Sequence, residues 1–264
     1  MPRLAANLSF LFTELPFLDR FAAAAAAGFR AVEYMFPYGE DSDEIRRRLD
    51  EHDLQQVLFN LPAGDWAGGE RGIACLPGRE AEFRRGVQLA LPLAKKFGVR
   101  RLNALAGTKP RDVADDDCRR VMLGNLRYAA DLLGDADIRL LVEPINSRID
   151  MPGFWLDTPA KAVSLLEALG HPNVFLQYDI YHAHVMGEDV LAALPARLPA
   201  IAHIQLADSP GRHQPGTGDI PFDDIFRWLD ASGYAGWVGC EYRPRAASTD
   251  SFGWAAAWLA NRAG

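Results

Sequence analysis

The sequence has few cysteines and no long apolar run, and each shortage excludes a class of protein. Cys75, Cys118 and Cys240 are scattered without metal-type spacing, so we expect neither a disulfide framework nor a zinc–thiolate site. No segment approaches the roughly 18 continuous apolar residues of a membrane span. Asn7 and Ser9 interrupt the apolar start, so we expect no secretory signal and take the cytoplasm as the default location.

Basic residues are also fewer than acidic ones. The chain carries 28 Lys and Arg against 35 Asp and Glu, a formal net charge of −7. Proteins that bind nucleic acid usually present a basic surface, so this balance argues against a polyanionic partner. We expect neither nucleic acid nor membrane to be its partner.

Short β-rich runs alternate along the chain with longer helical patterns. Within one helical pattern, "DTPAKAVSLLEALGHPN", Thr158 can cap the helix, Pro159 suits its first turn and Gly170 ends it. The strand candidates are residues 3 to 9, 30 to 35, 54 to 60, 99 to 105, 138 to 143, 173 to 179, 200 to 206 and 236 to 241.

Eight such alternations without a break in composition predict one α/β domain over residues 1–264, a single (β/α)8 barrel. The competing fold is an open, doubly wound sheet. That fold usually carries a glycine-rich phosphate turn after its first strand, and "LSFLFTELP" has none.

Four consecutive strand candidates end in a polar side chain. The runs are "IRLLVEPINSR", "VFLQYDIYH", "AHIQLADSP" and "GWVGCEYRP", and the side chains are Glu143, Asp179, Gln205 and Glu241. In barrels of parallel strands, active sites form at this end of the strands. Three converging carboxylates repel one another unless a cation or shared protons compensate. An all-oxygen donor set suits Mg²⁺ or Mn²⁺, so we expect Glu143, Asp179, Gln205 and Glu241 to bind a divalent metal.

Side-chain alternation along the strands indicates what surrounds these residues. Cys240 points away from Glu241 toward the outer helices and is expected to be core. Gln177 and His203 lie one layer deeper than Asp179 and Gln205, where they would support them. Glu33 and Asn60 also end strand candidates, but we place them on the far half of the barrel and expect less of them.

One connection is longer than the others. Residues 61–78, "LPAGDWAGGERGIACLPG", separate the third strand candidate from its helix, where two to six residues are usual. Long loops of this kind often cover a binding site, so we expect a lid-like loop at 61–78.

Several motifs together resemble the hydroxypyruvate isomerase family, within the xylose isomerase-like TIM barrels. They are "ANLSFLF", "EYMFPY", "NLPAGDWAGGERGIACLPGRE", "EPIN", "QYDIYH", "PGTGDIPF" and "GWVGCEYRP", and they span essentially the whole chain. The resemblance implies interconversion of hydroxypyruvate and tartronate semialdehyde, with Glu143 and Glu241 as the catalytic, proton-transferring pair. It also implies that Asp179 and Gln205 complete a metal-binding quartet. Related ketose 3-epimerases have histidine at the position of Gln205, so this difference favours the isomerase branch.

Substrates of this class carry a carboxylate, which calls for cationic or donor groups at the barrel mouth. We expect His182, which follows Asp179 in "DIYH", to bind a substrate oxygen. The cation candidates are Arg212 first, then Arg71 in the long loop and Lys109 after the fourth strand.

The isomerisation that the resemblance implies determines which catalytic groups are needed. Moving a carbonyl to the neighbouring carbon requires a proton to leave one carbon and another to return beside it. Two carboxylates can divide this acid and base work while an enediolate is stabilised. We therefore expect Glu143 and Glu241 to flank the substrate.

Other functions remain open at this stage. A close relative of this family would isomerise the four-carbon acid 2-oxo-tetronate, or a related ketose. A catalytically silent sugar-binding barrel is the non-enzyme alternative. Barrel endonucleases that cut abasic DNA share the architecture, but they need more histidine ligands and a basic face. The oligomeric state, including a possible homo-oligomer, cannot be read from the sequence.

Overall fold

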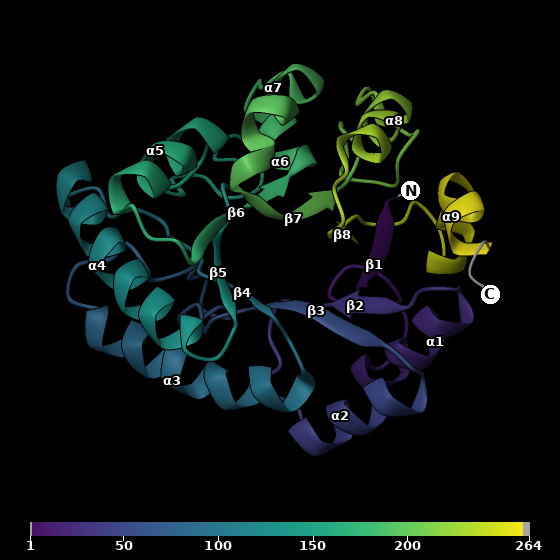
Figure 1. The fold of residues 1–264 in the computed structure, drawn as a ribbon, viewed down its shortest axis with the longest axis horizontal. Helices are drawn as coiled ribbons and strands as arrows, with labels where there is room; N and C mark the ends of the chain where they lie inside the picture. The colour runs from purple at the N-terminus through teal and green to yellow at the C-terminus, as the bar shows by residue number, and fades with distance from the viewer. Residues whose placement is uncertain (1, 261–264) are drawn as a thin grey trace.

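Eight parallel strands close into a barrel in the computed structural model, which describes residues 2–260 (Figure 1). Each strand pairs with its neighbours in the sequence, and β1 pairs with β8 to close the ring. All eight predicted strands are present, so the predicted (β/α)8 barrel is confirmed. The strands are β1 Arg3–Asn7, β2 Ala31–Glu33, β3 Gln55–Asn60, β4 Arg101–Asn103, β5 Arg139–Val142, β6 Val174–Asp179, β7 Ile201–Leu206 and β8 Trp237–Cys240.

Helices surround the barrel on its outer side (Figure 1). Between β6 and β7 the described chain forms two helices, where a strict alternation would place one. Met1 and residues 261–264 of the predicted domain lie outside the described residues. The α-helices are α1 Arg20–Ala26, α2 Ser42–Glu51, α3 Glu80–Phe97, α4 Asp115–Gly134, α5 Pro159–Leu169, α6 Ile180–Val185, α7 Val190–Arg197, α8 Phe222–Ser232 and α9 Ala256–Ala260.

The predicted boundaries of α5 are confirmed. The Thr158 side chain accepts a hydrogen bond from the backbone N–H of Lys161, and Pro159 occupies the first turn. Gly170 ends the helix with φ of 59°, a left-handed conformation that favours glycine. None of the helices described is long and apolar enough to span a bilayer.

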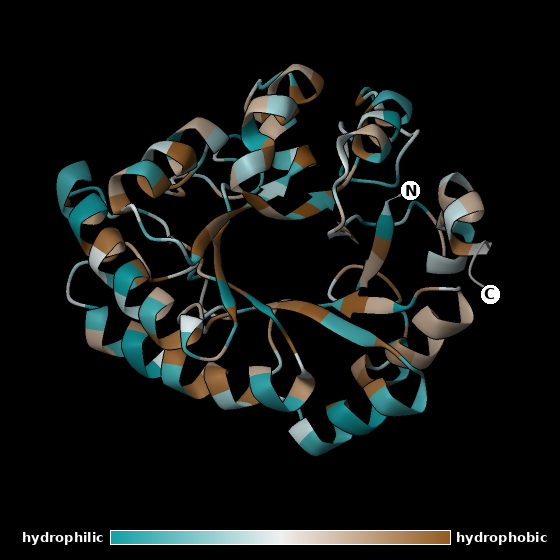
Figure 2. Ribbon diagram, in the orientation of Figure 1, coloured by the Kyte–Doolittle hydropathy of each residue, from teal (hydrophilic) through white to brown (hydrophobic). Residues whose placement is uncertain are grey.

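Apolar side chains form two separate clusters. The larger one fills the space between the strands and the helices, and it contains Cys240, which is therefore a core residue as predicted. The smaller one plugs the barrel interior and consists of Ala5, Ala31, Val57, Leu58, Leu141, Ala202 and Trp237. Figure 2 shows hydrophobic and hydrophilic stretches interspersed along the strands. The rest of the interior holds buried polar side chains, among them Gln177 and His203.

The loop between β7 and α8 is held by one buried carboxylate. Asp208 is fully buried, and each of its two oxygens accepts two backbone N–H bonds, of 2.8 to 3.2 Å. Because an ionised acceptor strengthens each hydrogen bond, this residue fixes the loop that carries Arg212. The four donors are Ser209, Thr217, Gly218 and Ile220.

Replacement of Asp208 by alanine should lower the free energy of unfolding by about 2 to 4 kcal/mol, because four backbone N–H groups lose a charged acceptor. Urea denaturation measures this change. Asp219→Ala, in the same loop but exposed, serves as the matched control and should change stability by less than about 0.5 kcal/mol. Equal stabilities of the two variants would show that Asp208 does not hold the loop.

Candidate active site

The four polar side chains expected at the strand ends do come together at one end of the barrel. Asp179 is the last residue of β6, while Glu143 and Glu241 directly follow β5 and β8. In the strand register Asp179 lies beside Gln205, and Gln205 lies beside Gly239. All four side chains are buried, with Glu241 the most exposed at 8%.

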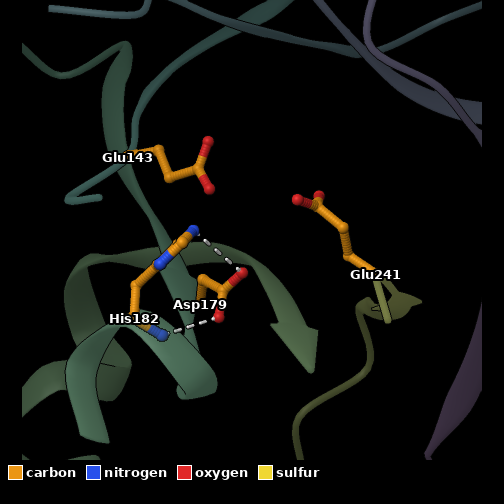
Figure 3. A group of neighbouring side chains, drawn as sticks. All are labelled: Glu143, Asp179, His182 and Glu241. Carbon is orange, nitrogen blue, oxygen red and sulfur yellow. Dashed lines mark hydrogen bonds and ion pairs between the residues drawn. The ribbon is translucent and has the colours of Figure 1, made fainter. Parts of the chain in front are cut away.

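Three of these residues and His182 form a compact cluster. One ligand atom from each of Glu143, Asp179, His182 and Glu241 lies within 4.8 Å of the others. Figure 3 shows the carboxylates of Glu143 and Glu241 pointing toward each other, with His182 and Asp179 below Glu143 in this view. The Asp179 side chain also caps α6 by accepting the backbone N–H of His182 at 3.0 Å.

Glu241 is held by donors on both of its oxygens. Oε1 accepts from Arg212 at 2.6 Å, while Oε2 accepts from the amide nitrogens of Asn7 at 3.0 Å and Gln205 at 2.5 Å. Burial raises the pKa of Glu241 well above its ordinary value, and the positive charge of Arg212 acts in the opposite direction.

Glu143 has a sparser environment. Its Oε2 accepts one hydrogen bond, from the Asn103 amide at 2.9 Å. Burial, with the neighbouring charge of Asp179, raises the pKa of Glu143 to about 8. The two glutamates therefore sit in unlike surroundings on opposite sides of the same space.

His182 is oriented by a neighbouring amide. The Nδ2 of Asn146 lies 2.7 Å from Nδ1 of His182 and 2.7 Å from Oδ2 of Asp150. Since the amide NH₂ can only donate, Nδ1 accepts and Nε2 carries the proton. Burial lowers the pKa of His182 to about 4, with Asp179 opposing the shift. At neutral pH the imidazole is thus uncharged, and its Nε2 lies 3.8 Å from Asp179.

Arg212 is a buried cation between two carboxylates. Its guanidinium donates to Asp150 at 3.0 Å and to Glu241 at 2.6 Å, and it lies over the rings of Phe10 and Tyr181. Burial opposes its charge, but Glu241, Asp179 and Asp150 outweigh burial and raise the pKa of Arg212. This cation neutralises part of the carboxylate cluster.

The cluster opens into a cavity of about 620 Å³. Trp66 and Arg71 of the long loop line this cavity, as do His182 and Arg212. Lys109 is not among the lining residues; its ammonium donates to the carbonyl of Val113. The remaining polar lining includes Asn7, Ser9, Thr13, Glu14, Asn60, Asp150, Arg243 and Ser248.

The long loop has an anchored half and an exposed half. Residues 72–75 are buried and bond to the backbone of Leu105 and Ala106. Gly72 has φ of 117° and no room for a Cβ against Leu105, so this anchor requires glycine. Residues 64–71 form the exposed tip, where Arg71 stacks on Trp66 and donates to the carbonyls of Trp66 and Glu70.

The sequence analysis expected little of the polar residues that end the first four strands. Their last residues are Asn7, Glu33, Asn60 and Asn103, so a polar side chain ends each of them as well. Glu33 does end a strand in the other half of the barrel, but expecting less of it was wrong, because its carboxylate bonds Gln205 and His203 of β7 across the interior. A closed barrel of eight strands is narrow enough for such contacts. The same strand-end signal would have found these residues.

The cluster suits a metal ion by its donors. Three carboxylates converge, and Oδ2 of Asp179 is buried without a hydrogen-bond partner in the described structure, while His182 presents its Nε2–H and not a free lone pair. Such an orphaned acceptor fits a cation. Gln205 faces Glu33 and Glu241 with its amide nitrogen, and its oxygen accepts from Gln177 at 2.5 Å. For Gln205 to bind a metal, its amide group would have to turn over so that the oxygen faces the cluster.

Comparison with known proteins gives consistent results. A family model described as xylose isomerase-like TIM barrel matches residues 21–262. The chain is 46% identical to 2-oxo-tetronate isomerase of Cupriavidus necator, over 98% of this chain and 99% of that one. It is also 46% identical to hydroxypyruvate isomerase of Escherichia coli, over 96% and 98%. A solved structure titled AP endonuclease, family 2, from Brucella melitensis superposes with a TM-score of 0.95 at 45% identity, covering 98% and 99%.

Addition of Mn²⁺ or Mg²⁺ should raise the melting temperature if the cluster binds the ion. At about 100 times the Kd, binding adds about 2.7 kcal/mol, which corresponds to roughly 5 to 10 °C for a chain of this size. Asp179→Asn should abolish the shift, while Asp116→Asn on the exposed face of α4 should keep it. Differential scanning calorimetry measures all three chains, and a shift that persists in Asp179→Asn would place the ion elsewhere.

Proposed function

This chain belongs to the xylose isomerase-like TIM barrel family, and we propose that it interconverts hydroxypyruvate and 2-hydroxy-3-oxopropanoate (tartronate semialdehyde). Relatives 46% identical over nearly the whole chain are isomerases by name. The observation that carries the proposal is the pair of buried glutamates, Glu143 and Glu241, on opposite sides of one cavity (Figure 3).

In the proposed reaction, one glutamate removes a proton from the hydroxymethyl carbon of hydroxypyruvate, which gives an enediolate. A proton is then returned to the neighbouring carbon, and the hydroxyl proton passes to the former carbonyl oxygen. Two carboxylates that face each other across the substrate can divide this acid and base work. Their different environments give the two glutamates different affinities for the proton.

Donors beside the glutamates support the charge that develops on the substrate oxygens. The neutral imidazole of His182 directs its Nε2–H toward the cluster, and Arg212 supplies a buried positive charge. We propose Glu143, Asp179 and Glu241 as the ligands of a divalent ion, Mg²⁺ or Mn²⁺; Gln205, expected as the fourth ligand, would join them only with its amide turned over. When bound, such an ion would supply a Lewis acid for the substrate oxygens.

We assign the substrate carboxylate to Arg71. The charge of Arg212 is shared by Asp150 and Glu241, whereas Arg71 forms no ion pair within residues 2–260. Two backbone carbonyls and the Trp66 ring hold the Arg71 guanidinium at the cavity wall. The exposed tip at residues 64–71 would thus act as the lid of the predicted loop at 61–78, with residues 72–75 as its anchor.

The second candidate is isomerisation of 2-oxo-tetronate. A relative 46% identical to this chain carries that name. A cavity of about 620 Å³ also leaves room for a fourth carbon. A DNA-cutting activity is disfavoured by the net charge of −7 and by a cluster with one histidine.

A turnover screen tests the function and separates the candidates. Hydroxypyruvate, 2-oxo-tetronate and uncharged ketoses are each supplied with and without chelator, and the product is analysed. Turnover of uncharged ketoses alone would contradict the proposed substrate class. In D₂O, solvent deuterium in the product is expected from proton transfer through a glutamate.

Glu143→Gln and Glu241→Gln should each lower kcat by at least about 10²-fold, because the amide keeps the shape and cannot take up the proton. The double variant should cost little more than the worse single variant, since members of one catalytic unit are not additive. Steady-state kinetics measures the effect, with Glu82→Gln on the outer helix α3 as the control. Near-normal turnover of Glu241→Gln would refute the paired-carboxylate mechanism.

Arg71→Gln should raise the KM for hydroxypyruvate about 10-fold or more while kcat changes little, since a charge-assisted contact to the substrate is lost. Lys109→Gln is the matched control, because Lys109 lies outside the cavity lining, and its KM should match that of the unchanged chain. If Lys109→Gln raised the KM and Arg71→Gln did not, Lys109 would be the residue that binds the substrate carboxylate.

A further inference from the structure

Glu33 lies beneath the carboxylate cluster and takes no part in the proton transfer proposed above. It ends β2, its side chain is fully buried, and it accepts three hydrogen bonds. Its Oε1 accepts from the amides of Asn7 at 3.0 Å and Gln205 at 2.7 Å, while Oε2 lies 2.6 Å from Nε2 of His203. A buried carboxylate with this many donors is held firmly in place.

The two amides that bond Glu33 also bond Glu241. The Nδ2 of Asn7 and the Nε2 of Gln205 each lie within 3.0 Å of both Oε1 of Glu33 and Oε2 of Glu241. Each NH₂ group has two hydrogens, so each can serve one oxygen of each carboxylate. The two carboxylates and two amides therefore form a closed ring.

This ring determines which end of each amide faces Glu241. An amide can present either its oxygen or its NH₂ group, and only the NH₂ group bonds a carboxylate. Because Glu33 lies on the other side, it requires the NH₂ groups of Asn7 and Gln205 to face inward. Without Glu33, either amide could rotate and leave Oε2 of Glu241 without a donor.

Gly239 leaves space for the Glu33 carboxylate in this ring. Gly239 precedes Glu241 by two residues on the same face of the chain, and a Cβ at this position would overlap the Glu33 carboxylate. Gly239 does not have a positive φ, so its role is to make room and not to permit a strained backbone.

We propose that Glu33 is a positioning residue: through the amides of Asn7 and Gln205 it holds the Glu241 carboxylate at the angle from which it faces the substrate. This proposal rests on the proposed function of Glu241. Arg212 fixes the other oxygen of Glu241, so the two contacts together determine its orientation.

Three variants separate positioning from a purely structural role. Glu33→Ala should lower kcat about 10-fold or more and leave KM within about 2-fold, because the residues proposed to bind the substrate, His182, Arg212 and Arg71, are unchanged. Glu33→Gln should restore most of the kcat, since its carbonyl can still accept from both amides while its NH₂ group donates to Nε2 of His203, whose proton then lies on Nδ1. Gly239→Ala should reproduce the loss of kcat with Glu33 still present.

His203→Leu is the matched control. It removes the donor on Oε2 of Glu33 and leaves the ring on Oε1 intact, and Nδ1 of His203 has no hydrogen-bond partner among the described residues. We expect a lower melting temperature with nearly unchanged kcat. If kcat instead followed the melting temperature across all four variants, or if Glu33→Ala kept full kcat, the positioning role would be wrong.

The failure of this proposal is distinguishable from failure of the proposed function. If the unchanged chain turned over neither hydroxypyruvate nor 2-oxo-tetronate, the function would fail before any variant is compared. Crystal structures of Glu33→Ala and Gly239→Ala provide a readout independent of turnover. A Glu241 carboxylate in its original position in both would overturn the positioning role.

Discussion

The burial of like charges at one end of the barrel is the constraint on which the rest of this structure depends. Glu143, Asp179 and Glu241 lie close together and away from water. Each buried carboxylate costs several kcal/mol unless donors or a cation compensate. The protein supplies a buried arginine and a set of side-chain amides, and within residues 2–260 it leaves one oxygen of Asp179 without a hydrogen-bond partner.

In the barrel, the buried charges lie apart from the apolar contacts that stabilise the fold. Apolar side chains plug part of the interior and fill the outer layer, while the polar residues gather where the strands end. Loops beyond the strands then complete the site. Asp208 shows how such a loop is held, since four backbone donors on one carboxylate fix the segment that carries Arg212.

The two facing glutamates differ because their supports differ. Glu241 accepts from Arg212 and from two amides, whereas Glu143 accepts from a single amide. A pair of carboxylates in unlike environments can hold a proton unequally, which suits a reaction that moves a proton between neighbouring carbons. Glu33 extends this logic one layer deeper, where a further carboxylate orients the amides that reach Glu241.

The sequence by itself determined the strands, the boundaries of α5 and the polar residues at four strand ends. These features are local: alternation, capping and strand length are set by neighbouring residues. Tertiary structure alone decided the partners of those residues. Asn7 meets Glu241 and Glu33 meets His203 across separations of 234 and 170 residues. Lys109 and Arg71 were equally plausible cations until folding placed only Arg71 at the cavity. Contacts across a barrel depend on how the ring of strands closes, and that closure cannot be predicted from residues that are neighbours in the sequence.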